Sequence, residues 1–259
     1  MGRLKGKVAI VTGAGQGVGY GVARALAREG AKVVCANRNA EKGEAVVASI
    51  REDFAESGAE ALYRQTDVSQ RESVLGLVDE TVSAFGGVDI LVNNATPTGG
   101  TSRFESMTDA AMNDYMSVNY YASFWAMQAA FPAMKAQGWG RIITMCSLNG
   151  INAHRYTVMY NASKEAARSL TRTAAREWGQ DGITVNCVCP ASVAHRMPVG
   201  EENSERASAF AEMYKDHPLG RDGDPEVDIA PVVAFLLSDA SQYMTGQTFM
   251  VDGGGIMRA

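Results

Sequence analysis

The sequence predicts an α/β fold built on one doubly wound parallel sheet of about seven strands, with helices on both faces. Short β-branched runs alternate along the chain with helix-length amphipathic stretches, and the first run leads into a glycine-rich turn. No repeat, low-complexity tract or Gly/Ser linker divides the 259 residues, of which 46% are apolar. A chain of this length and composition can bury one large core, so we expect a single domain over residues 1–259.

The expected elements follow the βαβ order of a Rossmann-type sheet. Strands are expected at residues 8–11, 32–36, 61–66, 88–92, 141–147, 184–189 and 248–251. Helices are expected at residues 18–29, 41–56, near 70–85, at 158–179 and at 227–238, and a further helix is expected to contain 119–134. The run at 8–11 is entirely apolar and the run at 88–92 nearly so, as expected for strands that helices cover on both faces.

Charge and composition exclude several classes of protein. The chain has 24 Lys and Arg against 29 Asp and Glu, and this net charge of -5 gives no basic surface for a nucleic-acid partner. The longest uncharged stretch, 115–134, has the length of a membrane span, but Ser117, Asn119 and Pro132 interrupt it, so we expect a buried helix. The four cysteines form no CxxC pair and there are only three histidines, which predicts no metal site, reduced thiols and a cytoplasmic location.

The turn after the first expected strand indicates a dinucleotide site. It runs Thr12, Gly13, Ala14, Gly15, Gln16, Gly17, Val18 and Gly19, and it opens a helix. Glycines let the backbone turn tightly and approach a pyrophosphate, whose charge is stabilised by the free N–H groups at the helix N-terminus. A glycine turn alone is weak evidence, but its place between a strand and a helix makes it a specific indication of nucleotide binding.

The spacing of this turn, with Thr12, Gly13, Gly17 and Gly19 at its fixed positions, resembles that of the short-chain dehydrogenase/reductase family. The resemblance extends over essentially the whole chain, through Asp67-Val68, Asn93-Asn94-Ala95, Asn119, Ser147, Tyr160-x3-Lys164, Asn186 and Asp252-Gly253-Gly254. It implies an oxidoreductase that transfers a hydride between a nicotinamide cofactor and a small hydroxy or keto compound. It also implies a homotetramer formed through the helices that contain 122–134 and 166–178.

The end of the second expected strand favours NADP(H) over NAD(H). Sites that prefer NAD normally place an acid there to accept from the ribose 2′-hydroxyl, whereas this chain has Asn37 and Arg38. Without a carboxylate at this position the 2′-phosphate of NADP(H) is not repelled, and the guanidinium of Arg38 can bind that phosphate with two hydrogen bonds. Against this, Gln16 stands where phosphate-binding members of the family often carry Lys or Arg, so NAD(H) remains the alternative, with Asn37 bonded to its ribose.

The remaining cofactor contacts follow from the resemblance alone. Asp67 is expected to meet the adenine amino group. The other expected contacts are Gly15, Val68, Asn94, Ala95, Pro190, Ala191, Val193 and His195, together with Tyr160 and Lys164. Three positions depart from the family pattern: Thr96 and Ala191 replace glycines, and His195 replaces a threonine. The first two add bulk beside the nicotinamide, and the third puts the usual hydroxyl contact to its carboxamide in doubt.

Tyr160 and Lys164 are the expected centre of the chemistry. Hydride transfer to a carbonyl carbon needs a matching proton on the oxygen, and a phenol serves only where its anion is stabilised. Lys164, one helical turn away, supplies the stabilising charge and by resemblance also holds the nicotinamide ribose. By the same resemblance Ser147 donates to the substrate oxygen, and Asn119 anchors a water that links Lys164 to solvent. The alternatives are a plain strand-end hydroxyl at Ser147 and a buried polar cap at Asn119.

The substrate side is less defined. By analogy the pocket is lined by residues 96–100, 148–154 and 192–217, and a proline-rich segment around 191–222 is expected to be either a lid or an ordinary surface connection. One rival function is a 3-oxoacyl-thioester reductase that acts on an acyl carrier, which needs a basic docking surface that Lys135, Arg141 and Arg172 are too scattered to establish. The other is a non-catalytic, nucleotide-sensing binding protein on the same fold.

Overall fold

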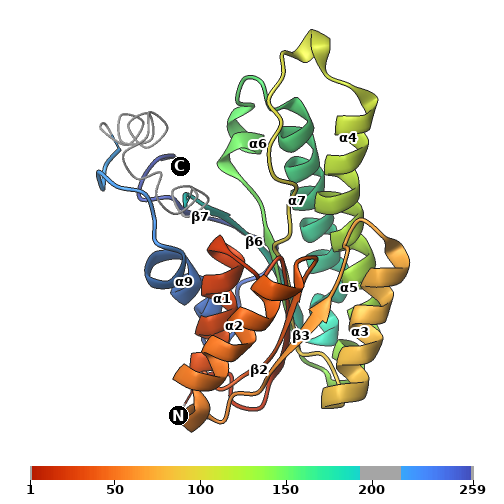
Figure 1. The fold of residues 1–259 in the computed structure, drawn as a ribbon, viewed down its shortest axis with the longest axis vertical. Helices are drawn as coiled ribbons and strands as arrows, with labels where there is room; N and C mark the ends of the chain where they lie inside the picture. The colour runs from red at the N-terminus through yellow and green to blue at the C-terminus, as the bar shows by residue number, and fades with distance from the viewer. Residues whose placement is uncertain (1, 193–216, 258–259) are drawn as a thin grey trace.

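The structure is a computed structural model that describes residues 2–192 and 217–257 (Figure 1). Val193 and His195, two of the expected cofactor contacts, lie outside these ranges. Most of the segment at 191–222, for which a lid was the functional expectation, lies outside them too. None of the helices in the described ranges is both long and apolar enough to cross a membrane.

Seven parallel strands form one sheet in the order β3-β2-β1-β4-β5-β6-β7. The strands are β1 (Val8–Thr12), β2 (Lys32–Asn37), β3 (Ala61–Gln65), β4 (Ile90–Asn93), β5 (Gly140–Met145), β6 (Ile183–Pro190) and β7 (Thr248–Val251). β1 pairs with β2 on one side and β4 on the other, so the winding direction reverses between them. The predicted doubly wound sheet is confirmed, and its ligand crevice is expected at the carboxyl ends of β1 and β4.

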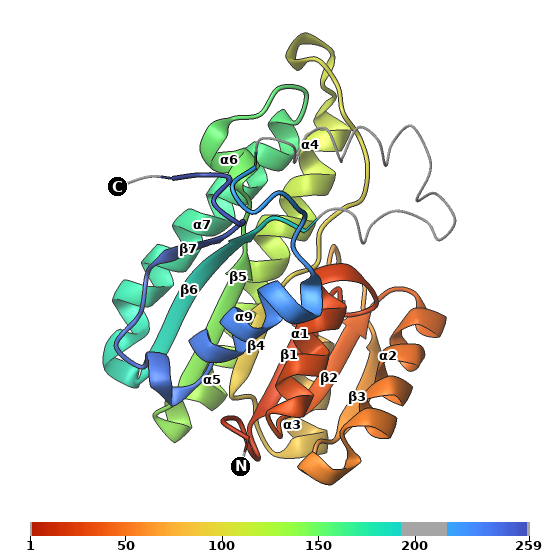
Figure 2. The same cartoon turned by 90° about the vertical axis from the view of Figure 1, so that its left-hand side faces the viewer.

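Helices cover both faces of the sheet (Figures 1 and 2). One face carries α1 (Gly17–Arg28), α2 (Ala40–Asp53) and α9 (Ala230–Leu236), and the other carries α3 (Arg71–Phe85), α5 (Ala122–Gln137) and α7 (Val158–Trp178). Each face has its own buried cluster. Val22 and Leu26 of α1 pack into the first cluster, and Met127 and Met134 of α5 pack into the second. The near-continuous apolar strands predicted from the sequence are therefore buried from both sides.

The uncharged stretch is helical, and the helical segment continues on its N-terminal side into residues for which no helix was predicted. α4 (Asp109–Met116) passes through a π-helical turn (Ser117–Tyr121) directly into α5. α4 was not predicted because its polar residues interrupt the apolar periodicity of the sequence. Thr108 caps its start, since the Thr108 hydroxyl accepts from the amide of Ala111. Pro132 lies inside α5 without ending it.

Several short elements were not predicted. α6 (Leu148–Asn152) follows β5, and a π-helical turn (Pro225–Ile229) precedes α9. Short 3₁₀ turns lie at Ala55–Ser57, Phe104–Ser106, Gly179–Asp181 and Asp239–Ser241. As Figure 1 shows, α6 and the start of α4 rise above the carboxyl ends of the strands. Of these elements, α6 and the end of α4 contribute residues to a cavity at this edge, namely Leu148, Asn149, Asn152 and Tyr115.

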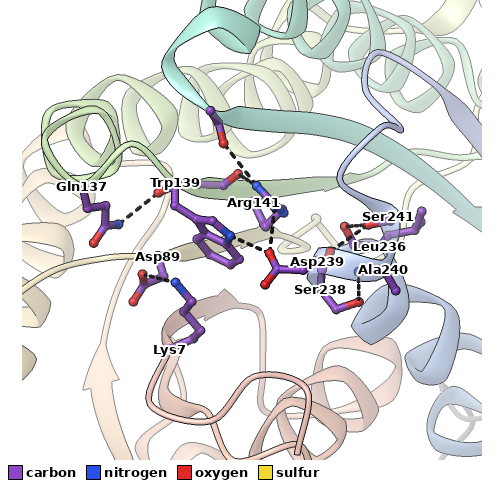
Figure 3. Close-up of polar contacts among 12 residues, drawn as sticks. Lys7, Asp89, Gln137, Trp139, Arg141, Leu236, Ser238, Asp239, Ala240 and Ser241 are labelled. Atoms are coloured by element: carbon purple, nitrogen blue, oxygen red, sulfur yellow. Dashed lines mark hydrogen bonds and ion pairs between the residues drawn. The ribbon is translucent and has the colours of Figure 1, made fainter.

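A polar cluster fixes the opposite, amino end of the sheet (Figure 3). Arg141 in β5 is 3% exposed and donates to the Asp239 carboxylate at 3.1 Å and to the carbonyl of Gly182 at 3.2 Å. Its guanidinium lies 4.2 Å from the ring centre of Trp139, whose indole N–H donates to the same carboxylate at 2.8 Å. Burial lowers the pKa of Arg141, which the charge of Asp239 partly offsets. This cluster joins the start of β5 to the connection between α9 and β7.

The interior strand β5 offers a test of the core. Ile143 is fully buried between the two helical layers, so Ile143→Ala should lower the free energy of unfolding by about 2–5 kcal/mol through lost burial and a residual cavity. Val82 on α3 is 37% exposed, and Val82→Ala should cost well under about 1 kcal/mol. Urea unfolding followed by circular dichroism measures both changes. Equal losses for the two variants would contradict this description of the core.

Candidate active site

The glycine turn connects β1 to α1 at the carboxyl end of the sheet. Gly13 has φ +66° and Gly17 has φ +56°, in the left-handed region that L side chains rarely adopt. Gly19 has an ordinary φ but no room, because a Cβ there would lie 2.3 Å from the carbonyl oxygen of Gly13. Gln16, the residue before α1, makes no side-chain cap. The amides at the start of α1 are therefore not capped by a side chain, as expected of a site for a pyrophosphate.

Asn94 and Thr12 hold this turn against the end of β4. The Asn94 amide group donates to the carbonyls of Thr12, at 2.9 Å, and Gly13, at 3.2 Å. The Thr12 hydroxyl donates to the carbonyl of Val92 at 3.3 Å and accepts from the amides of Asn94 and Ala95. Two residues expected to contact the cofactor thus shape the crevice with their side chains.

The residues expected around the adenosine lie at the ends of β2 and β3. The Asn37 amide group donates to the carbonyl of Asn39 at 2.8 Å, and within the described residues its side-chain oxygen is buried without a partner. Arg38 follows it on the surface. The Asp67 carboxylate accepts from the amide and hydroxyl of Ser69 at 3.0 and 2.8 Å, and Val68 is buried beside it.

Ser147, Tyr160 and Lys164 line one cavity of about 620 Å³ at the carboxyl ends of β4, β5 and β6. The wall of this cavity also includes Val18, Asn94, Thr96, Pro190, Ala191 and Ser192. Three of the four expected catalytic residues are therefore brought together next to the glycine turn. Thr96 and Ala191, two of the departures from the family pattern, do reach the cavity wall, where they take up space that glycine would leave open.

Ser147 caps the short helix α6. Its hydroxyl oxygen accepts from the amide of Asn149 at 3.1 Å. A hydroxyl has one donor and two acceptor sites, and this cap uses only an acceptor site. Within the described residues no acceptor is seen for the hydroxyl hydrogen of Ser147, so this hydrogen can donate into the cavity that the residue lines.

Lys164 joins the helix that carries Tyr160 to the strand that leads to Ser147. Lys164 is 4% exposed, and its ammonium donates to the carbonyl of Met145, the last residue of β5, at 2.7 Å. The same nitrogen lies 5.7 Å from the centre of the Tyr160 ring. An ammonium has three donors, so one N–H fixes the lysine while the others serve the cavity that it lines.

Asn119 is buried in the π-helical turn and does not line the cavity. Its side-chain nitrogen donates to the Ser163 hydroxyl at 2.9 Å, and that hydroxyl donates to the carbonyl of Tyr160 at 3.0 Å. Within the described residues the Asn119 side-chain oxygen has no partner. The water that was expected to link Asn119 to Lys164 remains a prediction, and the unpaired oxygen supports it, because buried acceptors are usually satisfied.

Sequence reasoning missed Tyr115 and the left-handed backbone conformations in the loop between α6 and α7, although it did place His154 of that loop in the pocket wall. The ring of Tyr115 meets that of Tyr160 edge to face at 6.0 Å, and its hydroxyl donates to the carbonyl of Gly99. In the loop, Ala153 and Tyr156 have φ values of 51° and 68°, a strained conformation that is frequent near functional sites. The only available signal for Tyr115 was its place at the start of the uncharged stretch.

Three buried thiols lie behind Ser147. Cys146 and Cys187 have their sulfur atoms 3.4 Å apart, and Cys189 packs in the same cluster. The hydrogen bond to Cys187 and burial together raise the pKa of the Cys146 thiol. Burial raises the pKa of Cys189 to about 12. Cys146 and Cys189 therefore act as protonated, apolar packing rather than as nucleophiles.

Two other motif residues have structural roles. The Asn186 amide group donates to the carbonyl of Met244 at 2.7 Å, and its oxygen accepts from the amide of Gln247 at 3.0 Å. The Asp252 carboxylate accepts from the amides of Gly254, at 3.1 Å, and Ile256, at 2.8 Å. Asn186 aligns β6 with the segment that enters β7, and Asp252 closes the turn after it.

A substitution at Gly19 tests whether the glycine turn binds the nucleotide. Gly19→Ala places a methyl group 2.3 Å from the Gly13 carbonyl and 2.4 Å from the Asn94 nitrogen, so the turn must shift. We expect NADP⁺ affinity, measured by calorimetry, to fall by about tenfold or more. Gly76 on α3 has open space around it, so Gly76→Ala should leave the affinity unchanged. Equal affinity in both variants would argue against this turn as the binding site.

Comparison with known proteins agrees with this geometry. Residues 13–255 match a family model described as enoyl-(acyl carrier protein) reductase. The chain is 33% identical to a diacetyl reductase [(S)-acetoin forming] of Staphylococcus epidermidis, over 97% of this chain and 99% of that protein. It is 34% identical to a cyclohexanol dehydrogenase of an Acinetobacter species, over 97% of this chain and 95% of that protein.

A solved structure shares the fold as well as the sequence. The crystal structure of a proposed short-chain alcohol dehydrogenase from Sinorhizobium meliloti matches with a TM-score of 0.88 and 33% identity, over 97% of this chain and 96% of that chain. The chain is therefore an oxidoreductase that belongs to the short-chain dehydrogenase/reductase family.

Proposed function

We propose that the protein transfers a hydride between a nicotinamide cofactor, with NADP(H) favoured, and a small hydroxy or keto compound, with Tyr160 as general acid or base. The observation that carries this proposal is that Ser147, Tyr160 and Lys164 line one cavity beside the glycine turn. The uncapped start of α1 and the crowded glycines at 13 and 19 fit a dinucleotide, whose nicotinamide ring supplies or accepts the hydride.

The proton steps follow from the hydrogen bonds of the three residues. Ser147 keeps its hydroxyl hydrogen for the substrate oxygen, because its cap contact uses only an acceptor site. Tyr160 gives its phenolic proton to that oxygen in the reducing direction and takes it back in the other. The ammonium of Lys164, held by the carbonyl of Met145, stabilises the phenolate that forms.

The preference for NADP(H) rests on the end of β2. Asn37 ends the strand without a carboxylate, and the exposed Arg38 follows it. An acid at this position selects NAD by accepting from the ribose 2′-hydroxyl, and it repels a 2′-phosphate. A neutral amide followed by a guanidinium favours the phosphate.

A small substrate is supported by the cavity and by the names of the relatives. Asn149 and His154 make part of the wall polar, and Leu148 makes part of it apolar. The two relatives compared above are named for acetoin formation and for cyclohexanol oxidation, both small hydroxy or keto compounds.

The two rival functions receive less support. For the acyl-carrier reductase, Arg141 is buried against Asp239, and Lys135 is paired with Asp181 at 3.2 Å, so neither adds to a basic docking surface. For the nucleotide-sensing binding protein, the complete set of Ser147, Tyr160 and Lys164 around one cavity is the argument against it.

We also propose one domain that assembles into a homotetramer through α5 and α7. β1 and β7, from the two ends of the chain, lie in the same sheet, which supports a single domain. Tyr121, just before α5, is 46% exposed, and Phe124 in α5 is 36% exposed. Burial of these aromatic side chains against another subunit would therefore stabilise the assembly. Sedimentation at micromolar concentration should give a mass about four times 27.6 kDa. A monomeric mass would overturn the assembly and leave the chemistry untouched.

Tyr160→Phe is the test of the chemistry. Without the phenolic proton, we expect kcat to fall by about 10²- to 10⁴-fold. The affinity for NADP⁺ should stay within about twofold, because no hydride or proton moves on binding. Tyr243 is fully exposed, and Tyr243→Phe should leave turnover unchanged. A Tyr160→Phe enzyme with near-normal turnover of a ketone would refute the assigned role.

A further inference from the structure

Lys42 lies against the glycine turn although it is far from the turn in sequence. Its ammonium donates to the side-chain oxygen of Gln16 at 2.5 Å, across 26 positions of the chain. Gln16 is the position at which NADP-binding relatives often carry a cation, and its neutral side chain argued against NADP(H) in the sequence. The structure places a cation on that side chain from another element.

The start of α2 holds Lys42 in this place. Asn39 caps α2 by accepting from the amide of Lys42 at 2.9 Å. The missing side chain of Gly15 allows α2 to approach the turn, because a Cβ there would lie 3.1 Å from that of Lys42 and 2.6 Å from the Asn37 nitrogen. The backbone that positions Lys42 is therefore fixed by a cap on one side and a close approach on the other.

Two cations without a carboxylate partner among the described residues, Arg38 and Lys42, lie at this edge of the crevice. Within those residues the ammonium of Lys42 contacts only a neutral amide. Glu41, the adjacent acid on α2, is exposed, and no ion pair joins it to either cation within the described residues. Two cations thus stand beside the residue, Asn37, at which an NAD-selective site would carry an acid.

We propose that Lys42 is a specificity residue that binds the 2′-phosphate of NADP(H) together with Arg38, with Gln16 as its positioning partner. This inference rests on the proposed preference for NADP(H) and names the residue that produces it. The ammonium has three donors, of which Gln16 takes one, so two remain for phosphate oxygens. Hydrogen bonds between ionised groups are stronger than neutral ones, so losing Lys42 should weaken phosphate binding specifically.

The test compares two adenine nucleotides that differ in the 2′-phosphate. Calorimetry gives Kd values for 2′,5′-ADP and for 5′-AMP with wild type and Lys42→Met. We expect Lys42→Met to weaken 2′,5′-ADP binding by about tenfold and to change 5′-AMP binding by less than about twofold. Lys42→Arg keeps the charge and should retain the wild-type preference.

Lys5→Met is the matched control. Lys5 is exposed and precedes β1, at the opposite end of the sheet, so the variant makes the same change in net charge away from the crevice. It should leave both Kd values unchanged. An equal effect of Lys5→Met and Lys42→Met would show a general charge effect and overturn the inference, as would an equal loss of affinity for both nucleotides in Lys42→Met.

Failure of the inference and failure of the proposed preference give different results. If the wild-type protein binds 2′,5′-ADP no more tightly than 5′-AMP, the preference for NADP(H) is wrong, and the role of Lys42 is wrong with it. If wild type prefers 2′,5′-ADP and Lys42→Met keeps that preference, only the role of Lys42 is overturned. Arg38→Met then tells whether the guanidinium alone produces the preference.

Discussion

A single buried ammonium organises the chemical side of this protein. Lys164 donates to the carbonyl of Met145 and so ties α7 to the end of β5, two residues before Ser147. Burying a charge is unfavourable unless polar groups compensate for the lost water. The carbonyl supplies one such group, and the cavity beside Tyr160 supplies the space for others. The same contact therefore holds the helix that carries Tyr160 against the end of the strand that leads to Ser147, and it keeps the ammonium 5.7 Å from the centre of the Tyr160 ring.

The polar groups at the two ends of the sheet are used differently. At the amino end, Arg141, Trp139 and Asp239 use their polar groups on one another and on backbone carbonyls. At the carboxyl end, Asn94 and Thr12 satisfy the backbone around the glycine turn, and the helix N-terminus is left without a side-chain cap. Because the strands are parallel, every turn that follows a strand reaches this one edge. A loop can therefore bring a new residue to the crevice without disturbing the opposite end.

Local patterns predicted the frame and most of the site, and contacts between distant elements account for the rest. The strand runs and the glycine turn are local in sequence, so their periods and spacing could be interpreted directly. The π-helical turn around Asn119 could not, because it depends on how α4 and α5 pack against α7. The short helix α6 was also missed, since it forms around the cap that Ser147 provides. The proposed role of Lys42 could not be predicted from the sequence either. It depends on how closely α2 approaches the turn, and the spacing of residues along the chain gives no information on that contact.

The contact between Lys42 and Gln16 shows why one motif position is a poor guide to cofactor preference. A phosphate interacts with the total positive charge within a few ångströms, whichever element supplies it. A cation on the glycine turn and a cation on α2 that touches the turn are therefore nearly equivalent to the ligand. Their dependence on the fold differs, because the second needs Gly15 to lack a side chain and Asn39 to cap the helix. Under the proposed role of Lys42, the preference for NADP(H) depends on the packing of α2 against the turn. A substitution at Gly15 or Asn39 should then weaken that preference without removing a charge.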